Sequence, residues 1–392
     1  MGFTVKSNTK VAVKKETTEG TYAAPAAEDF ITALEDGLEV NGSKESLERN
    51  ILGTGLTKAQ SRTANRSVSG TIPCEFKAGS TDGSAPEYSV LVEAALGDIR
   101  NNSSSITTGT GHSTTVLNIE DVDISKLKVG DSIIIKESGA HHISVITAVD
   151  ETLGAANITL LTAGTSAFSD NVEIAAHTTY FTADKDHPTF SVTKYIEDAV
   201  EKRGTGCRVN SMAIENFVPN QLATLNFGFE GLDFSDSLNA PGVTPTFDSS
   251  LPPIIVSACL FKNGTQLTVA ELSLSVENTV ALITSTCQAS GKIGSRISER
   301  TITGSLTPYI EDNNIDIQTN FDNDDLFSLF FYAYNPTATA GEFNQAIAVY
   351  LPNCSITELG ETDSDGIMQF SLSFEASGGT DGSDTQMFMT YI

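Results

Sequence analysis

The sequence predicts a mainly β protein in which one β domain, flanked by a single α-helix, occurs twice. Short runs rich in Val, Ile, Thr and Phe alternate with Gly, Asn, Asp and Pro, a pattern typical of strands and turns. One strand-like motif occurs twice, and a helix-like segment follows it each time. A chain of 392 residues is long enough for two or three domains with cores of their own.

The repeated motif begins at Ser61 as SRTANRSVSG and at Ser295 as SRISERTITG, an offset of 234 positions. The flanks match at the same offset and alternate as a half-buried strand does, which indicates an internal duplication. The corresponding pairs are Leu38 with Leu272, Val40 with Leu274, Lys58 with Lys292, Arg62 with Arg296, Arg66 with Arg300, and Gly70 with Gly304.

A helix is predicted at the corresponding place in each half. In APEYSVLVEAALG (85–97), Pro86 suits the first turn and Gly97 the C-terminal cap. In FDNDDLFSLFFYAYN (321–335), aspartates favour the N-terminus. Each segment has one apolar stripe, which indicates packing against a core rather than a ligand site. The stripes are Tyr88, Leu91, Val92 and Ala95, and Leu326, Leu329, Phe330 and Ala333.

Two further strands recur at a slightly different offset. GCRVNSMAIENF (206–217) corresponds to NCSITELGETDS (353–364), and an alternating strand follows each, ending at Gly231 and Ala376. The first half has many more residues between its helix and this strand, which places an insertion at residues 101–180.

The insertion carries the short strands LKVGDSIII, ISVITAV and NITLL, which predict a small β-barrel-like module. All five histidines lie in or beside it, but His141 and His142 point to opposite faces of a strand, so no metal site is predicted. The Pro-rich segment 241–253 predicts a linker. The predicted division is a first domain of residues 1–100 and 181–240, the insertion 101–180, the linker, and a second domain of residues 254–392.

Composition excludes several classes of function. A formal net charge of −27 repels phosphate backbones and argues against sequence-directed nucleic-acid binding. No segment has the apolar length to span a bilayer, and the first residues lack the pattern of a signal peptide. Five cysteines without a CxxC pair indicate reduced, mostly buried thiols of a chain made in a cytoplasm.

The sequence also predicts a protein that is not an enzyme and binds no cofactor. It lacks the GxSxG and HExxH motifs, and SGK (290–292) lacks the glycine spacing of a phosphate loop. TDSDG (362–366) lacks the later ligands of a calcium loop and predicts a hairpin turn.

Cations gather in two loops at matching places of the two halves, on a chain that is otherwise strongly acidic. This distribution predicts that the chain binds other copies of itself, and a heterologous self-contact closes into a ring or continues as a filament. Loops that are merely solvated by their charges are the alternative. The cations in question are Lys58, Arg62, Arg66, Lys292, Arg296 and Arg300.

Four stretches of the first half occur in a characteristic order: KKETTEGTYAAP (14–25), RSVSGTIPCEF (66–76), the helix ending AALG at Gly97, and GCRVNSMAIE (206–215). Together they resemble the tail tube proteins of long-tailed bacteriophages (siphophages). The resemblance covers most of the first half outside the insertion. The second half lacks the KETTEGT element, so its assignment depends on the internal repeat.

The resemblance implies a tail-tube-type β-sandwich or half-barrel with one flanking α-helix, six of which form a ring. A duplicated chain would then form homotrimeric rings, which stack into a hollow tube. Such a tube holds the tape-measure protein, meets tail-end proteins, and conducts DNA for ejection without binding it specifically. The six cations would join successive rings, and the insertion would lie on the outer surface. The chain would be a virion protein made in the host bacterial cytoplasm, without a membrane anchor.

Two other functions remain as alternatives. A secreted or surface-layer β-repeat adhesin is disfavoured by the lack of a signal-peptide pattern and by the odd number of cysteines. A polysaccharide-active enzyme is disfavoured because no acid/base pair of carboxylates can be placed.

Overall fold

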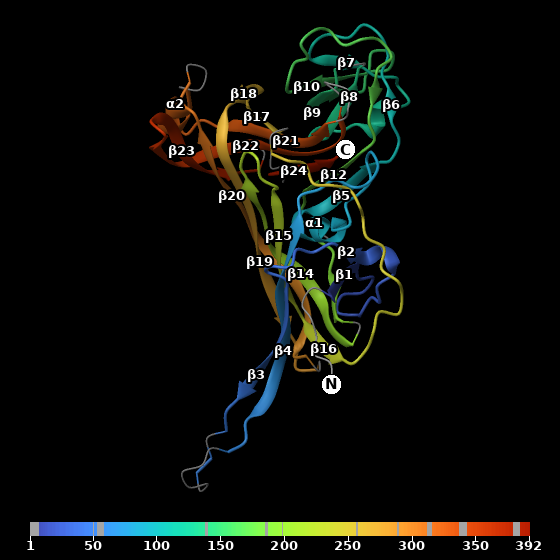
Figure 1. The fold of residues 1–392 in the computed structure, drawn as a ribbon, viewed down its shortest axis with the longest axis vertical. Coiled ribbons are helices and arrows are strands. Elements are labelled where there is room, and N and C mark those ends of the chain that lie inside the picture. Colours follow the sequence, from blue (N-terminus) through green and yellow to red (C-terminus); the bar gives the residue numbers. More distant parts are fainter. Residues whose placement is uncertain are drawn as a thin grey trace.

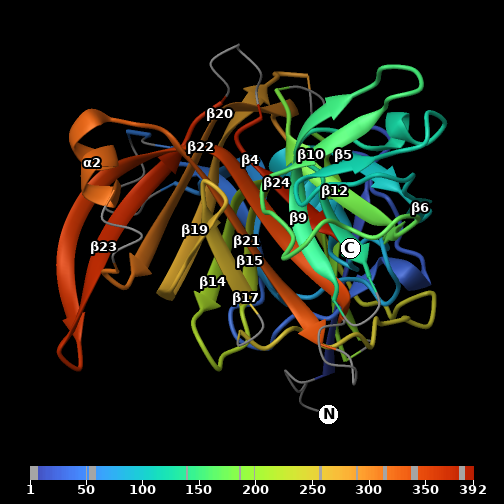
Figure 2. The ribbon, with the colours of Figure 1, turned by 90° about the horizontal axis from the view of Figure 1, so that it is seen from above.

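The structure, a computed structural model, is mainly β and has a long hairpin extending from one end of the body (Figure 1). Seen from above, the strands of the large sheet curve into a half-barrel (Figure 2). The structure describes residues 8–49, 51–52, 59–137, 140–184, 187–197, 199–255, 258–287, 290–311, 316–336, 343–378 and 385–392.

The elements follow one another along the chain in four groups. The first is β1 (Thr9–Lys15), β2 (Phe30–Ile31), β3 (Glu39–Leu47), β4 (Arg62–Glu75), α1 (Ser89–Leu96) and β5 (Gly97–Asn102). The second is β6 (Ile106–Thr107), β7 (Val116–Asn118), β8 (Ser132–Lys136), β9 (His142–Asp150), β10 (Asn157–Leu160) and β11 (Glu173–Ile174). The third is β12 (His177–Thr182), β13 (Phe190–Ile196), β14 (Val200–Phe217), β15 (Thr224–Gly231) and β16 (Asp233–Ser237). The fourth is β17 (Ala258–Lys262), β18 (Thr265–Leu267), β19 (Val269–Thr284), β20 (Lys292–Pro308), α2 (Asp316–Asn323), β21 (Phe327–Pro336), β22 (Phe343–Ser364), β23 (Ile367–Ala376) and β24 (Phe388–Tyr391).

Two runs of five strands pair in the same order and register. One run is β3–β4–β15–β14–β13 and the other is β19–β20–β23–β22–β21. Gly70 and Gly304 occupy matching positions, each between an aliphatic residue and a Phe on the two neighbouring strands. The opposed residues are Val40 and Phe229 for Gly70, and Leu274 and Phe374 for Gly304.

The β-bulges of the two runs also coincide. The first lies opposite the step from Phe190 to Val192 of β13 and the step from Phe327 to Leu329 of β21, with the extra residue in β14 and in β22. The Phe before this bulge pairs with a buried cysteine in both runs, Cys207 or Cys354. A second bulge follows Val209 in β14 and Ile356 in β22. Because a bulge bends its strand and increases the local twist, bulges at the same places give both runs the same curvature.

The two runs are joined edge to edge by β14 and β19, which pair antiparallel from Ser211 to Phe217 and from Leu272 to Glu277. Side chains from both runs fill one apolar core. In it, the rings of Phe217 and Phe331 meet edge to face with their centroids 5.4 Å apart. The halves of the chain therefore share a sheet and a core within the residues described.

Strands β6–β11 form a separate six-stranded sheet with its own core. The flanking strands β5 and β12 pair with each other in the large sheet, and β12 also pairs with β24. The predicted boundaries of the insertion at residues 101 and 180 therefore fall inside strands of the large sheet. One side of the small sheet is buried against the second half, in a cluster that includes Ile134, Ile143, Val145, Phe330, Tyr350 and Phe388.

The predicted first helix is confirmed as α1, and Gly97 ends it with a φ of 118°. The predicted helix at residues 321–335 is wrong. The helix α2 ends at Asn323, and β21 begins at Phe327. Since Leu329, Phe330, Phe331 and Ala333 are all buried, β21 is apolar on both faces. A continuous apolar run of this kind contains the helical spacing by coincidence.

Residues 241–253, predicted as a linker, contain no strand or helix and run along the first half (Figure 1). Lys77, which is 2% exposed, forms an ion pair with Glu87 at 2.9 Å and donates a hydrogen bond to the carbonyl oxygen of Asp248 at 3.0 Å. The rings of Phe247 and Phe30 meet edge to face. These contacts fix the path of the segment across the first half.

Candidate assembly surfaces

One face of the large sheet is polar across both runs of strands. Alternation along each strand turns the apolar side chains to the core and small polar or acidic ones to the opposite face. Six strands contribute outward-facing residues to this face, and none of these residues is Lys or Arg. They are Glu39, Asn41 and Ser43; Ser67, Ser69 and Thr71; Ser211, Ala213 and Glu215; Ser273, Ser275 and Glu277; Thr301, Thr303 and Ser305; and Ser371, Ser373 and Glu375.

Cross-strand hydroxyl pairs order this polar face. The Oγ atoms of Ser43 and Ser67 lie 2.6 Å apart, and those of Ser273 and Ser305 lie 2.7 Å apart. The middle of the face is a hollow of ≈ 720 Å³ that spans strands of both runs. Short side chains therefore leave an open, uncluttered surface that carries carboxylates and hydroxyls.

Two strand edges are open within the described part of the chain. β3 pairs only with β4, and residues 358–364 of β22 pair only with β23. Their counterparts in the repeat, β19 and residues 211–217 of β14, pair with each other. An unpaired edge presents backbone N–H and C=O groups to which another chain can add a strand.

The long hairpin β19–β20 is docked on the first half. Asn278 is buried and donates hydrogen bonds to the carbonyl oxygens of Ala95 and Val209, at 3.0 and 3.2 Å. Arg300 donates to the carbonyl oxygens of Leu96 and Ala183, at 3.1 and 2.9 Å. The bonds to Ala95 and Leu96 satisfy carbonyls at the C-terminus of α1, where a cation is also favoured by the helix dipole.

His187 links Arg300 to the first half. Its Nε2 lies 2.8 Å from the Arg300 guanidinium and its Nδ1 lies 3.4 Å from the carbonyl oxygen of Ala94. Burial lowers the pKa of His187, and the charge of Arg300 lowers it further. The neutral imidazole thus accepts from Arg300 at Nε2 and donates from Nδ1.

Glu19 holds the outer part of the same hairpin. Its carboxylate accepts from the backbone N–H and the hydroxyl of Ser295, and pairs with Arg296 at 3.1 Å. Arg208 donates to the Ser295 hydroxyl at 2.8 Å, and burial lowers the pKa of this guanidinium. Glu19 belongs to the KETTEGT element, so this element clamps the second hairpin onto the first half.

Glu16 organises the loop that presents Glu19. Its buried carboxylate accepts from the backbone N–H groups of Gly20 and Gly206, both at 2.8 Å. It also accepts from the hydroxyls of Thr189 and Ser191. Four donors satisfy this carboxylate, as a buried charge requires.

The first hairpin, β3–β4, extends away from the body beyond the small strand β16 (Figure 1). Near its base, Arg66 pairs with Asp233 at 2.7 Å and lies over the ring of Phe234. Farther out, Arg62 is exposed. Leu52, in the short described stretch between the strands, is fully exposed.

A family model for phage tail tube proteins matches residues 6–378. The chain belongs to the phage tail tube protein family. No curated protein matches the sequence. Membership in this structural family makes the chain a component of a phage virion and agrees with a non-enzymatic role. Among the described residues, no helix could cross a membrane and no cluster of His, Cys, Asp and Glu could hold a metal ion.

The cations predicted as contacts between tube rings have different surroundings. Arg62 is exposed, and Arg296 is 67% exposed beside Glu19. Arg66 and Arg300 bond within the chain, and Lys292 is buried, which lowers its pKa. Lys58 lies outside the described residues. Their role between rings stays a prediction.

Several residues that position the assembly surfaces of this tail tube protein were missed from the sequence. Glu16, Glu19, Asn278 and His187 each act through partners far away along the chain. Glu16 and Glu19 belong to the KETTEGT motif, but the motif does not indicate what they bind.

Proposed function

We propose that three chains close into a ring of six half-barrels, and that stacked rings form the tail tube of a siphophage. Each chain would supply two of the six positions through its two runs of strands. Membership in the tail tube family supports the structural role. The matching register and bulges of the two runs support a domain duplication, and thus three chains instead of six.

The observation that carries the proposal is the β14–β19 ladder. It joins the two runs through edges whose counterparts, β3 and residues 358–364 of β22, are open. If the open edges of β3 and β22 pair in the register of the β14–β19 ladder, Ser43 of one chain lies opposite Glu358 of the next, and Asn41 lies opposite Gly360. Because the two edges differ, the contact is heterologous, and it forms a ring of three chains if the rotation between neighbours closes.

In this ring the polar face of the sheet lines the channel. Each Lys or Arg that neutralised a DNA phosphate would add a favourable, salt-dependent term to DNA binding. The outward stretches of the six strands carry Glu39, Glu215, Glu277 and Glu375 and no cation. DNA would therefore pass during ejection without being held, and the tape-measure protein would occupy the channel beforehand.

The β3–β4 hairpin is the element best placed to reach the next ring, because it extends beyond the body (Figure 1). Arg62 would meet carboxylates of that ring, since the protein carries 50 acidic against 23 basic side chains. In a ring, the second hairpin stays docked on its own first half.

Cysteine trapping tests the proposed edge contact. Ser43→Cys/Glu358→Cys, in a Cys287→Ser background that removes an exposed thiol, should form disulfide-linked oligomers on oxidation at high protein concentration. Ser43→Cys/Thr362→Cys is the matched control, since residue 362 lies four positions along the same strand. Equal trapping by both pairs, or by neither, would contradict the register.

A further inference from the structure

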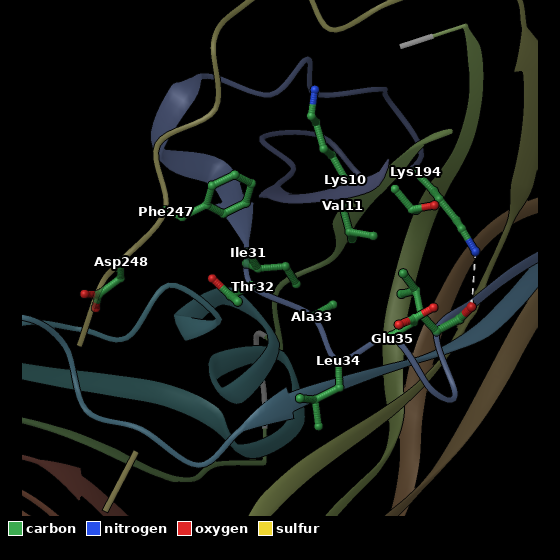
Figure 3. Close-up of a pocket in the computed structure, with 12 residues that line it drawn as sticks. Lys10, Val11, Ile31, Thr32, Ala33, Leu34, Glu35, Lys194, Phe247 and Asp248 are labelled. Carbon is green, nitrogen blue, oxygen red and sulfur yellow. Dashed lines mark hydrogen bonds between the residues drawn. The ribbon is translucent and has the colours of Figure 1, made fainter. Parts of the chain in front are cut away.

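The first half has an apolar pocket of ≈ 520 Å³ beside the open edge of β3. Val11, Ile31, Ala33, Leu34 and Leu38 contribute its apolar lining (Figure 3). Lys10 and Lys194 extend from β1 and β13 around it, and Lys194 donates to the carbonyl oxygen of Leu38 at 3.1 Å. Phe247 adds to the apolar lining, and the acidic residues Glu35 and Asp248 also line the pocket.

The second half has a pocket at the corresponding place. The β1–β13 and β1–β2 pairings of the first half recur as β17–β21 and β17–β18. In this register Val11 corresponds to Leu260, Ile31 to Leu267 and Lys194 to Phe331. Leu38 corresponds to Leu272 through the 234-residue offset. Leu260, Leu267 and Leu272 line the second pocket, which measures only ≈ 280 Å³.

The second pocket is smaller because the first half reaches into it. Phe217, at the end of β14, lies opposite Leu272 in the β14–β19 ladder and packs its ring against Phe331. Phe217 and Pro219, which lies in the turn that leads to β15, contribute to the lining. The end of one strand thus occupies part of the pocket beside the edge with which that strand pairs.

The counterpart of this filling turn is the β22–β23 hairpin. Phe217 corresponds to Ser364, the last residue of β22. Ile367 and Met368, the first two residues of β23, are 58% and 47% exposed. Asp363 lies at the end of β22, and Asp365 lies in the turn itself. Two exposed apolar side chains complement the apolar lining, and the two carboxylates complement the two lysines of a pocket that also carries Glu35 and Asp248.

We infer that the β22–β23 hairpin of one chain inserts Ile367 and Met368 into the Val11–Ile31–Leu38 pocket of the next chain, with Asp363 and Asp365 facing Lys10 and Lys194. The inference rests on the proposed ring, because the β3–β22 register places Ser364 beside Leu38 of the neighbouring chain. The occupant is a second copy of this chain. The filled pocket of the second half shows how the contact is made within one chain.

A cross-linking experiment tests this contact directly. Thr32 lines the pocket (Figure 3), and Thr32→Cys/Ile367→Cys in the Cys287→Ser background should form covalent oligomers with a short bis-maleimide. Leu34→Cys/Ile367→Cys is a second pair in case the first variant folds poorly. The matched control is Thr32→Cys/Leu153→Cys, because Leu153 is 89% exposed on the small module. Mass spectrometry identifies the linked peptides.

A second arm measures the consequence for assembly. Ile367→Lys/Met368→Lys would face two lysines and should weaken self-association at least about tenfold, which native mass spectrometry measures, while Leu153→Lys should associate like the wild type. Linked pocket and hairpin peptides support the inference. Trapping of Ser43→Cys/Glu358→Cys without any pocket cross-link would overturn the inference and leave the ring proposal standing. If neither the edge disulfide nor the pocket cross-link forms, both the inference and the ring proposal are overturned.

Discussion

The two long hairpins share a sequence motif and a register but have different surroundings. In β19–β20, Arg300 and Asn278 are bonded to carbonyls of the first half, and Glu19 holds Ser295. In β3–β4, the Arg66 side chain pairs with Asp233 of β16, its backbone N–H donates to the carbonyl oxygen of Ser290, and Arg62 is exposed. The difference teaches that one docking arrangement is completed inside the chain, whereas its counterpart would be completed by another chain in the proposed ring.

The glycines shared by the two hairpins should give the largest effect and show where the runs are alike. A Cβ on Gly70 would overlap the carbonyl oxygen of Glu39, and one on Gly304 would crowd Phe374 and the carbonyl oxygen of Ser273. Gly70→Ala and Gly304→Ala should each lower the free energy of unfolding by about 2–3 kcal/mol, measured in urea. Gly242→Ala, in open space, is the control. A large loss of unfolding free energy at only one of the two glycines would show that the two runs of strands are not equivalent there.

The paired arginines should give a smaller and unequal effect. Arg300→Ala removes bonds to two carbonyls and to His187, and should cost about 2 kcal/mol in the free energy of unfolding. Arg66→Ala removes a partly exposed ion pair and a ring contact, worth about 1 kcal/mol. Arg300→Lys should recover only part of the loss, because an ammonium lacks the planar fork. Equal costs at both positions would remove the distinction between docked and open hairpins.

Acid should loosen the docked hairpin in particular. The pKa of His187 in the folded chain lies below its ordinary value of 6.5, so the unfolded chain takes up the proton first as the pH falls. Stability is therefore lost from pH 6.5 downward, by at most about 1.4 kcal/mol per pH unit. His187→Gln should lose less stability than the wild type between pH 7.5 and 5.5, measured by urea unfolding at each pH. Identical losses would place the acid sensitivity elsewhere.

The outer arginines should give the smallest change in stability. Arg296→Glu breaks an exposed pair with Glu19 and should cost about 0.5 kcal/mol. Arg62→Glu should leave the folded chain unchanged in circular dichroism. It should nevertheless reduce the number of tubes seen by negative-stain microscopy, because the proposed function places the exposed Arg62 against the next ring. Normal tubes from Arg62→Glu would exclude this residue from the contact between rings.

The sequence was most informative where a pattern is local or repeated. Matched positions such as Gly70 and Gly304, and Cys207 and Cys354, could be paired because each depends on strand alternation and a fixed offset. The helix at 321–335 was a wrong prediction, since a strand buried on both faces has no period that distinguishes it from a helix.

The surroundings of the candidate site could not be predicted, because they depend on contacts between distant parts of the chain. Arg66 and Arg300 occupy matching positions in the sequence, yet Arg66 pairs with Asp233 and Arg300 meets a helix terminus more than 200 positions away. The packing of the small sheet, β6–β11, against the second half, through residues such as Ile143 and Tyr350, has no local sequence signal either.

The number of chains in one ring tests the central claim most directly, because it separates a duplicated chain from a single-domain one. Cryo-electron microscopy of assembled tubes, viewed in cross-section, counts both chains and half-barrels. The account predicts three chains and six half-barrels per ring, with β3 of each chain continuing into β22 of the next. Six chains per ring, or rings whose β3 and β22 edges stay apart, would contradict it.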